Sequence, residues 1–184
     1  MKIGLLSDSH SFIDAQILKH LNDCDEIWHV GDFGSFSVVE ELEKLGKPVR
    51  GVYGNIDGVK IRSVFPEVNN FEIEGFKVSM VHIGGYPDKY TPLAKKAIEA
   101  NRPHLFLSGH SHILKIVPDN KYNLLHINPG AVGNEGWHKV RTLILFDLHP
   151  SNHPPISNLR VVELGQRGSL NKHAETYTEE NSSE

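Results

Sequence analysis

Seven side chains of types that bind metal ions follow short apolar runs of the sequence. They lie in five separate groups: Ser7-Asp8-Ser9-His10, Gly31-Asp32, Gly54-Asn55, His82 and Gly109-His110-Ser111-His112. The groups offer two carboxylates, four imidazoles and one amide oxygen, with no thiolate. This mixture suits Mn²⁺, Fe²⁺, Co²⁺ or Zn²⁺ better than the all-oxygen cage that Ca²⁺ prefers. The chemistry that these residues could support is that of bound divalent cations.

The spacing within two of these groups favours a shared site. Asp8 and His10 are two residues apart, as are His110 and His112. In extended backbone, residues two apart point to the same side. We therefore expect each pair to direct both side chains into one crevice. Three of the groups begin with a glycine directly before the first potential ligand, and glycine allows sharp turns and close approach of the backbone.

Taken one at a time, these groups have simpler explanations. An Asp-x-His sequence after a strand is typical of a turn or a cap, and Gly-Asp and Gly-Asn are common turns. His82 alone could be a core histidine that is satisfied by hydrogen bonds. The occurrence of all five groups at successive strand ends favours a metal site.

The elements that must hold these side chains alternate in the first half of the chain. Apolar runs at 2–6, 26–30 and 48–53 predict buried strands. Helical spacing of apolar residues predicts helices at 13–21 and 37–45, the second ending at Gly46. This order predicts an α/β fold with parallel central strands, in which sites form at the carboxyl ends of the strands.

The second half of the chain is richer in predicted strands. A hairpin around Gly75 joins runs at 70–74 and 76–82, and a helix is expected at 92–101. Further strands are expected at 104–107, 113–117, 124–127, 142–148 and 159–164, and we expect this half to be antiparallel. Burying both halves predicts an α/β, four-layer α/β/β/α sandwich of two mixed β-sheets flanked by helices.

The domain organisation is expected to be simple. A chain of 184 residues fits one domain, which we place at 1–164. Residues 165–184 are polar and end in Glu-Glu-Asn-Ser-Ser-Glu, which predicts a flexible C-terminal tail.

Composition excludes several classes of function. The net charge is −4 and no basic stripe is visible, so broad electrostatic capture of nucleic acid is not indicated. A single cysteine, Cys24, rules out an internal disulfide framework and fits a reducing compartment. We see no signal peptide and no apolar run near the roughly 20 residues of a membrane span. A cytoplasmic location is expected.

The ordered set Asp-x-His, Gly-Asp, Gly-Asn, His and Gly-His-x-His resembles that of the calcineurin-like metallophosphoesterases. The resemblance covers about residues 1–148. The short chain, Gly54-Asn55-Ile56-Asp57 and Asn128-Pro129-Gly130 resemble the small YfcE/MJ0936-type phosphodiesterase branch in particular, which shares the VPS29-like fold.

The resemblance implies two divalent metal ions, with Mn²⁺ as the first expectation and Fe²⁺, Ni²⁺, Co²⁺ or Zn²⁺ as alternatives. One ion would be held by Asp8, His10, Asp32 and His112. The second would be held by Asp32, Asn55, His82 and His110, so that Asp32 bridges the two. It further implies hydrolysis of small or nucleotide-like phosphodiesters by a metal-bridging hydroxide. The catalytic roles are assigned to Asp32, Asn55 and His10.

Two positions depart from the pattern of the family. Many larger relatives carry a histidine where this chain has Ile56, and that histidine helps the leaving group depart. Small relatives often continue the His82 motif as His-Gly-His, whereas here it reads His82-Ile83-Gly84-Gly85-Tyr86. Monoesters with poor leaving groups are therefore expected to be weak substrates. Tyr86 either reaches the substrate or only packs in its loop.

Other candidates carry weaker signals. In the glycine-rich loop at 133–139, Trp137 could stack on a base, and His138 or Lys139 could meet phosphate. The alternative is an ordinary turn between strands. His126 lies inside a predicted strand, which favours a place in the core or behind the ligands.

Alternative functions remain open on the sequence alone. A non-catalytic, VPS29-like protein-interaction scaffold that retains metal is the alternative from a different class. Such a scaffold has no need for seven intact ligand positions, and all seven are present here, so the sequence argues against it. A nuclease would need a basic groove that the composition does not show. We expect a small phosphodiester as the partner, without membrane or extended nucleic acid, and a homo-oligomer is an open alternative.

Overall fold

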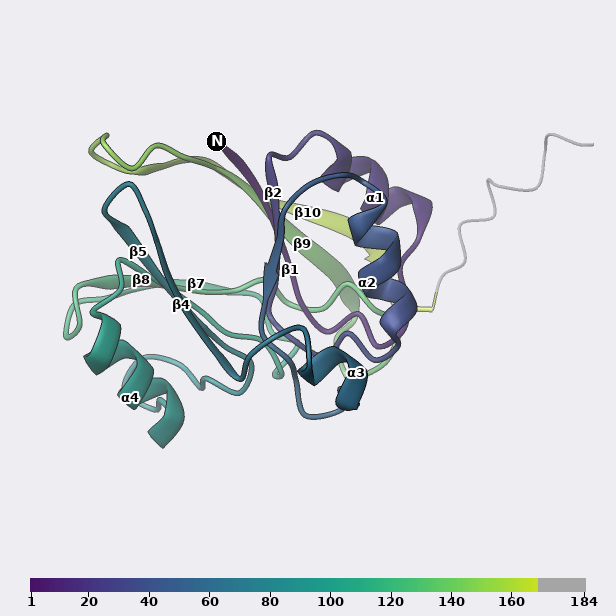
Figure 1. Cartoon of the computed structure of the whole chain (residues 1–184), viewed down its shortest axis with the longest axis horizontal. Coiled ribbons are helices and arrows are strands. Elements are labelled where there is room, and N and C mark those ends of the chain that lie inside the picture. The colour runs from purple at the N-terminus through teal and green to yellow at the C-terminus, as the bar shows by residue number, and fades with distance from the viewer. Residues whose placement is uncertain (169–184) are drawn as a thin grey trace, which may run out of the picture.

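The computed structural model describes residues 1–168, and the rest of the expected C-terminal tail lies outside the described residues. Two β-sheets pack against each other, with helices on their outer sides (Figure 1). This arrangement is the expected α/β/β/α sandwich.

The first sheet has the order β10-β9-β1-β2-β3. Its strands are β1 (Lys2–Leu6), β2 (Glu26–His29), β3 (Val49–Gly51), β9 (Val140–Leu148) and β10 (Ile156–Gln166). The pairs β1–β2 and β2–β3 are parallel, whereas β9 runs antiparallel to both β1 and β10. The parallel strands therefore bring their carboxyl ends to one edge.

The second sheet has the order β4-β5-β6-β8-β7. Its strands are β4 (Val68–Ile73), β5 (Phe76–Val81), β6 (Leu105–Leu107), β7 (Lys115–Asp119) and β8 (Leu124–Asn128). The expectation of an antiparallel second half was wrong for its centre, because β5–β6 and β6–β8 are parallel. Helix α4 (Pro92–Asn101) makes the β5-to-β6 crossover that a parallel pair requires. Both strands consequently end at the same edge.

Three apolar clusters fill the layers between these elements. Ile3 and Leu5 of β1 face the core between the sheets, together with Trp28, Met80 and other buried side chains. Leu6 faces the opposite way, toward the cluster that contains side chains of α1 (Ala15–Asn22) and α2 (Phe36–Glu43). A third cluster lies under α4. Because β1 is buried on both faces, its position is fixed by packing from two sides.

The element boundaries differ from the expected ones in ways that local chemistry explains. Helix α1 begins after Asp14, whose carboxylate accepts a hydrogen bond from the Ile17 N–H, so residue 13 is outside the helix. The four-residue helix α3 (Val59–Arg62) was not expected, because it is too short to show apolar periodicity. Strand β10 continues to Gln166, two residues into the segment expected to be tail.

Candidate metal centre

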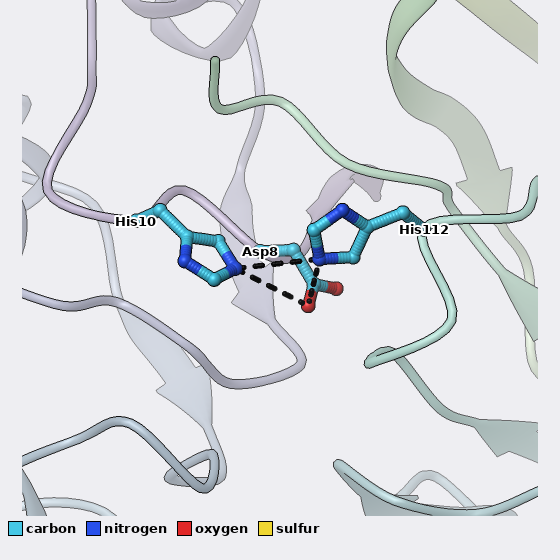
Figure 2. A group of neighbouring side chains, drawn as sticks. All are labelled: Asp8, His10 and His112. Atoms are coloured by element: carbon cyan, nitrogen blue, oxygen red, sulfur yellow. Dashed lines mark hydrogen bonds and ion pairs between the residues drawn. The ribbon is translucent and has the colours of Figure 1, made fainter. Parts of the chain in front are cut away.

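Six of the seven expected ligands meet in two neighbouring clusters at the carboxyl ends of the strands. The first cluster is Asp8, His10 and His112, and the second is Asp32, His82 and His110. Within each cluster the potential ligand atoms all lie within 4.8 Å of one another. Figure 2 shows the first cluster, in which the Asp8 carboxylate and the His10 ring from the loop after β1 and the His112 ring from the loop after β6 point toward one another.

Asp32 faces both clusters. Its Oδ1 lies 3.2 Å from His82 Nε2, and its Oδ2 lies 3.6 Å from His10 Nε2. A carboxylate that presents one oxygen to each cluster has the geometry that a ligand shared by two cations needs. The seventh expected ligand, Asn55, lines one cavity together with His82.

The backbone at these positions is unusual. Five of the seven expected ligands have φ values in the left-handed region: Asp8 at 55°, His10 at 47°, Asp32 at 56°, His110 at 66° and His112 at 56°. This conformation is uncommon for residues other than glycine, and such strain concentrates at functional sites. The packed strands that precede these loops hold the strained positions in place.

The left-handed backbone also corrects the argument from spacing. Asp8 and His10 do share a cluster, but His110 and His112 belong to different ones. The expectation assumed extended backbone, in which residues two apart share a side. Positive φ at both histidines redirects their side chains, so one loop serves both clusters.

Within the described residues, one ligand atom of Asp8 and one of His82 make no hydrogen bond and instead face another expected ligand: Asp8 Oδ1 lies 3.1 Å from His112 Nε2, and His82 Nε2 lies 3.2 Å from Asp32 Oδ1. Asp8 Oδ2 accepts hydrogen bonds from the Ser7 hydroxyl at 2.6 Å and from the His110 N–H at 3.1 Å, whereas Oδ1 is buried and makes none. His82 Nδ1 lies 2.7 Å from the Val30 carbonyl oxygen, which fixes the proton on Nδ1. Its Nε2 is buried and makes no hydrogen bond. Buried polar atoms are normally paired, so these two fit the donor set of a cation.

The electrostatic environment of the second cluster keeps the Asp32 side chain ionised. Burial alone would raise the pKa of Asp32, but His82, the Ile56 N–H and His10 outweigh it and hold that pKa below its ordinary value. Burial lowers the pKa of His82, and the carboxylates of Asp32 and Asp8 more than offset this, so the pKa is raised. Asp32 is therefore a carboxylate at neutral pH, as a metal ligand must be.

Two further polar residues tie the ligand loops together. Asp57 is buried and accepts hydrogen bonds from the Gly34 N–H at 2.8 Å and the Gly54 N–H at 2.7 Å, so it joins the loops after β2 and β3. Asn128 donates to the Gly109 carbonyl oxygen at 2.8 Å and thereby holds the loop after β6. Both belong to motifs that the sequence singled out, and both act here by positioning.

Gly54 and Gly109 allow the loops to approach the ligands. A Cβ atom at Gly54 would collide with the Asp32 carboxylate, and one at Gly109 would collide with the Ser7 hydroxyl. The expectation that glycines permit close backbone approach is confirmed at these two positions.

Two buried histidines support the ligand loops from behind. His29 Nε2 lies 3.0 Å from the Ser9 hydroxyl, and His126 Nε2 lies 2.9 Å from the Ser108 hydroxyl. Burial lowers the pKa of His29 to about 3 and that of His126 to about 4, so both rings are neutral. The place expected for His126, in the core behind the ligands, is confirmed. His29 showed no pattern in the sequence.

The loop at 133–139 contributes two side chains that sequence reasoning left out of the ligand set. His138 Nδ1 lies 3.1 Å from His112 Nδ1, and Glu135 Oε2 lies 3.7 Å from His10 Nδ1. The sequence had named His138 only as a possible phosphate contact, and for Glu135 the glycine-rich composition of the loop was the only signal. Trp137 in the same loop is 99% exposed, so nothing in the described chain packs on it.

The two positions that depart from the family pattern lie at the edge of the centre. The Ile56 N–H donates a hydrogen bond to Asp32 Oδ1 at 3.2 Å, while its side chain is exposed. Tyr86 lines a cavity that also contains His110. No helix within residues 1–168 is long and apolar enough to cross a membrane.

Comparison with known proteins agrees with this geometry. Residues 1–151 match the calcineurin-like phosphoesterase superfamily domain. A probable metallophosphoesterase of Methanothermobacter thermautotrophicus is 31% identical over 141 residues, covering 71% of this chain and 77% of that protein.

Solved structures share the fold at lower identity. A novel archaeal phosphodiesterase has 23% identity and a TM-score of 0.69 over 89% of this chain and all of its own. Wild-type Vps29 of Entamoeba histolytica, complexed with Zn²⁺, has 17% identity and a TM-score of 0.66 over 89% of this chain and 99% of its own. These likenesses concern the fold.

The two clusters of potential ligands suit the divalent metals that metallophosphoesterases use. The match over most of the chain, together with the relative of 31% identity, shows that this chain belongs to the calcineurin-like phosphoesterase superfamily.

Proposed function

We propose that this protein is a two-metal-dependent phosphodiesterase that hydrolyses small or nucleotide-like phosphodiesters. The observation that carries the proposal is the position of Asp32, which presents one carboxylate oxygen to each of two adjacent ligand clusters. In the proposed assignment one ion takes Asp8, His10, Asp32 and His112, and the other takes Asp32, Asn55, His82 and His110. Mn²⁺ is our first choice of metal, ahead of Fe²⁺, Ni²⁺, Co²⁺ and Zn²⁺.

When bound, two such ions neutralise charge on the phosphoryl oxygens and lower the pKa of water enough to supply a nucleophile near neutral pH. The protein's part is to hold the ligand atoms ready. His82 keeps its proton on Nδ1 through the Val30 carbonyl, so its Nε2 lone pair is free. The Ser7 and His110 donors hold the Asp8 carboxylate so that Oδ1 points away from them.

Three residues are proposed to act in catalysis as well as in binding. Asp32 fixes the spacing between the two clusters. His10, in the first cluster, has its Nε2 at 3.3 Å from His112 Nε2 in the same cluster and at 3.6 Å from Asp32 Oδ2 in the second. Asn55 is exposed at the rim of the cavity beside His82, where its side-chain amide can donate to a phosphoryl oxygen.

The preference for diesters rests on Ile56. Its aliphatic side chain cannot protonate a leaving group, and a monoester with a poor leaving group depends most on such help. We therefore propose an activated or small diester as substrate. The net charge is −4, so we do not propose extended nucleic acid as a partner. We propose a cytoplasmic location.

Hydrolysis of bis(4-nitrophenyl) phosphate, and of phenyl phosphate as a monoester with a poor leaving group, by the metal-loaded protein tests this proposal. We expect Mn²⁺-dependent turnover with a higher kcat/KM for the diester, and its loss on adding a chelator. Val161→Ala, an exposed change on β10 away from the clusters, serves as the control and should behave as wild type. If the diester is not hydrolysed with any of Mn²⁺, Ni²⁺, Co²⁺ or Zn²⁺, the proposal that this protein is an enzyme is refuted.

A non-catalytic scaffold is the second candidate, because the fold is also that of Vps29 proteins. The fully exposed Trp137 beside the centre is the observation in its favour, since exposed aromatic residues often mark partner surfaces. Metal binding without turnover of any diester would support this candidate over the enzyme.

A further inference from the structure

Two cavities flank the second ligand cluster and meet at Ile83. The first, which we call the Tyr86 cavity, has a volume of about 210 Å³ and contains His110 among its lining residues. The second, the Arg62 cavity, has a volume of about 240 Å³ and contains Asn55 and His82. Ile83 lines both cavities and is exposed. The second cluster thus contributes a lining residue to each of the two cavities.

The walls of the Tyr86 cavity suit a flat aromatic group. Tyr86 is 40% exposed and Ile113, which lines the same cavity, is 62% exposed, so both offer apolar surface to a ligand. Lys115 Nζ lies 4.1 Å from the Tyr86 ring centroid, which braces the ring against the edge strand β7. Among residues 1–168, no carboxylate lines this cavity.

The Arg62 cavity has a different character. The Arg62 Nε donates to the Asp57 carbonyl oxygen at 2.6 Å, and its guanidinium lies 4.5 Å from the Tyr53 ring centroid. Leu93 of α4 closes the far wall. This cavity therefore has a fixed polar side and an apolar side.

We propose that the phosphorus of the substrate lies at the second cluster and that the two ester arms of one diester occupy the two cavities, an aromatic arm entering the Tyr86 cavity. This inference rests on the proposed phosphodiesterase function. It adds the substrate class, a diester with at least one aromatic arm, and gives a second reason for the preference over monoesters. A monoester has one arm and leaves one cavity empty.

The first experiment measures binding, so that it does not depend on turnover. Phenylphosphonate and methylphosphonate are titrated into the metal-loaded protein by calorimetry. Wild type should bind the phenyl compound about tenfold more tightly, equivalent to about 1.4 kcal/mol, because its ring contacts Tyr86. Tyr86→Ala should reduce this ratio to about two, whereas Val161→Ala should leave it at ten.

The outcomes separate this inference from the function on which it rests. If neither phosphonate binds, the metal-phosphate centre itself is refuted. If both bind and wild type shows no preference for the phenyl compound, or if Tyr86→Ala keeps the full preference, the aromatic arm is not in the Tyr86 cavity.

The second experiment tests the other arm. Leu93→Trp narrows the Arg62 cavity, and Leu93→Met is the control of similar volume. The tryptophan variant should lower kcat/KM about tenfold for bis(4-nitrophenyl) phosphate but less than threefold for methyl 4-nitrophenyl phosphate, whose second arm is a methyl group. Equal effects on the two substrates, in a variant that melts like Leu93→Met, would overturn the two-cavity assignment.

Discussion

Strand β2 carries a buried carboxylate close to each end, and the two differ in how they are satisfied. Glu26, at its beginning, accepts hydrogen bonds from Trp28 Nε1 at 2.8 Å and from Arg50 Nε at 2.8 Å. Asp32, just past its end, faces His82 Nε2, an atom that makes no hydrogen bond. Asp8 Oδ1, in the adjoining cluster, is likewise buried, makes no hydrogen bond within the described residues and faces His112 Nε2 at 3.1 Å.

The pKa alone does not distinguish the two ends. Burial would raise the pKa of Glu26, but Arg50 and Trp28 lower it below its ordinary value, as His82 does for Asp32. What distinguishes them is the backbone and the lone pairs. Asp32 has a positive φ and its neighbours' ligand atoms converge on one region. A buried charge whose hydrogen bonds are all made stabilises the fold. Ligand atoms that converge without hydrogen bonds instead form a place where a cation can bind.

Removing the charge of Asp32 should produce the largest effect. We expect Asp32→Asn to lower kcat for bis(4-nitrophenyl) phosphate by about 100-fold or more, because one substitution weakens both clusters. Steady-state kinetics at saturating Mn²⁺ measures the loss. Glu26→Gln is the matched control at the other end of the strand and should retain activity within about twofold. Near-normal activity of Asp32→Asn would rule out a shared carboxylate.

Bound metal should stabilise the folded protein through Asp8 Oδ1, the buried oxygen that makes no hydrogen bond within the described residues. At a Mn²⁺ concentration 100 times the Kd, each bound ion should add about 2.7 kcal/mol to the free energy of unfolding of the wild type, and the ion of the first cluster accounts for one such gain. Asp8→Asn should lose most of this gain. In chelator it should stay within about 1 kcal/mol of wild type, because Asp8 Oδ1 makes no hydrogen bond within the described residues and has only the His112 Nε2 at 3.1 Å beside it. Urea titrations with and without metal give both values, and a full gain in Asp8→Asn would contradict the assignment.

A histidine in place of Ile56 sharpens the comparison at the Asp32 end. The Ile56 side chain is 44% exposed while its N–H bonds Asp32, so an imidazole fits there without disturbing the core. We expect Ile56→His to raise kcat/KM for phenyl phosphate, a monoester with a poor leaving group, about tenfold, because the ring can protonate the departing oxygen. Ile56→Leu is the control. If kcat/KM does not rise in Ile56→His, then Ile56 is not the residue that restricts the substrate range.

The smallest effect is expected at the Glu26 end. Glu26→Gln should cost about 1 kcal/mol of stability, because Arg50 is more than a third exposed and solvent screens the pair. Since the folded pKa of Glu26 is lowered, its contribution is present above the unfolded pKa near 4.5 and is lost as pH falls through the folded value. Urea unfolding between pH 7 and pH 3 should therefore show a smaller decline for the variant. An equal decline would contradict the ion pair.

The architecture and the position of the centre followed from the sequence because both depend on patterns that repeat along it. Apolar runs marked the strands, and the polar groups directly after them marked the shared edge. Packing decided the rest. The parallel centre of the second sheet depends on where α4 packs, which no local pattern specifies.

Within the centre, the backbone was the part that the sequence could not supply. Spacing alone placed His110 and His112 on one side, whereas left-handed φ values divide them between two clusters. His29 and Glu135 reach the centre through tertiary contacts at 3.0 Å to Ser9 and 3.7 Å to His10, and neither has a motif of its own. Such contacts depend on loops that the surrounding fold holds in strained conformations.

Metal stoichiometry tests the central claim most directly. Equilibrium dialysis of the wild-type protein against Mn²⁺, read by elemental analysis, counts the ions bound at saturation. Two clusters that share Asp32 predict two ions per chain. Saturation at one ion per chain, or no binding at all, would contradict the two-metal centre.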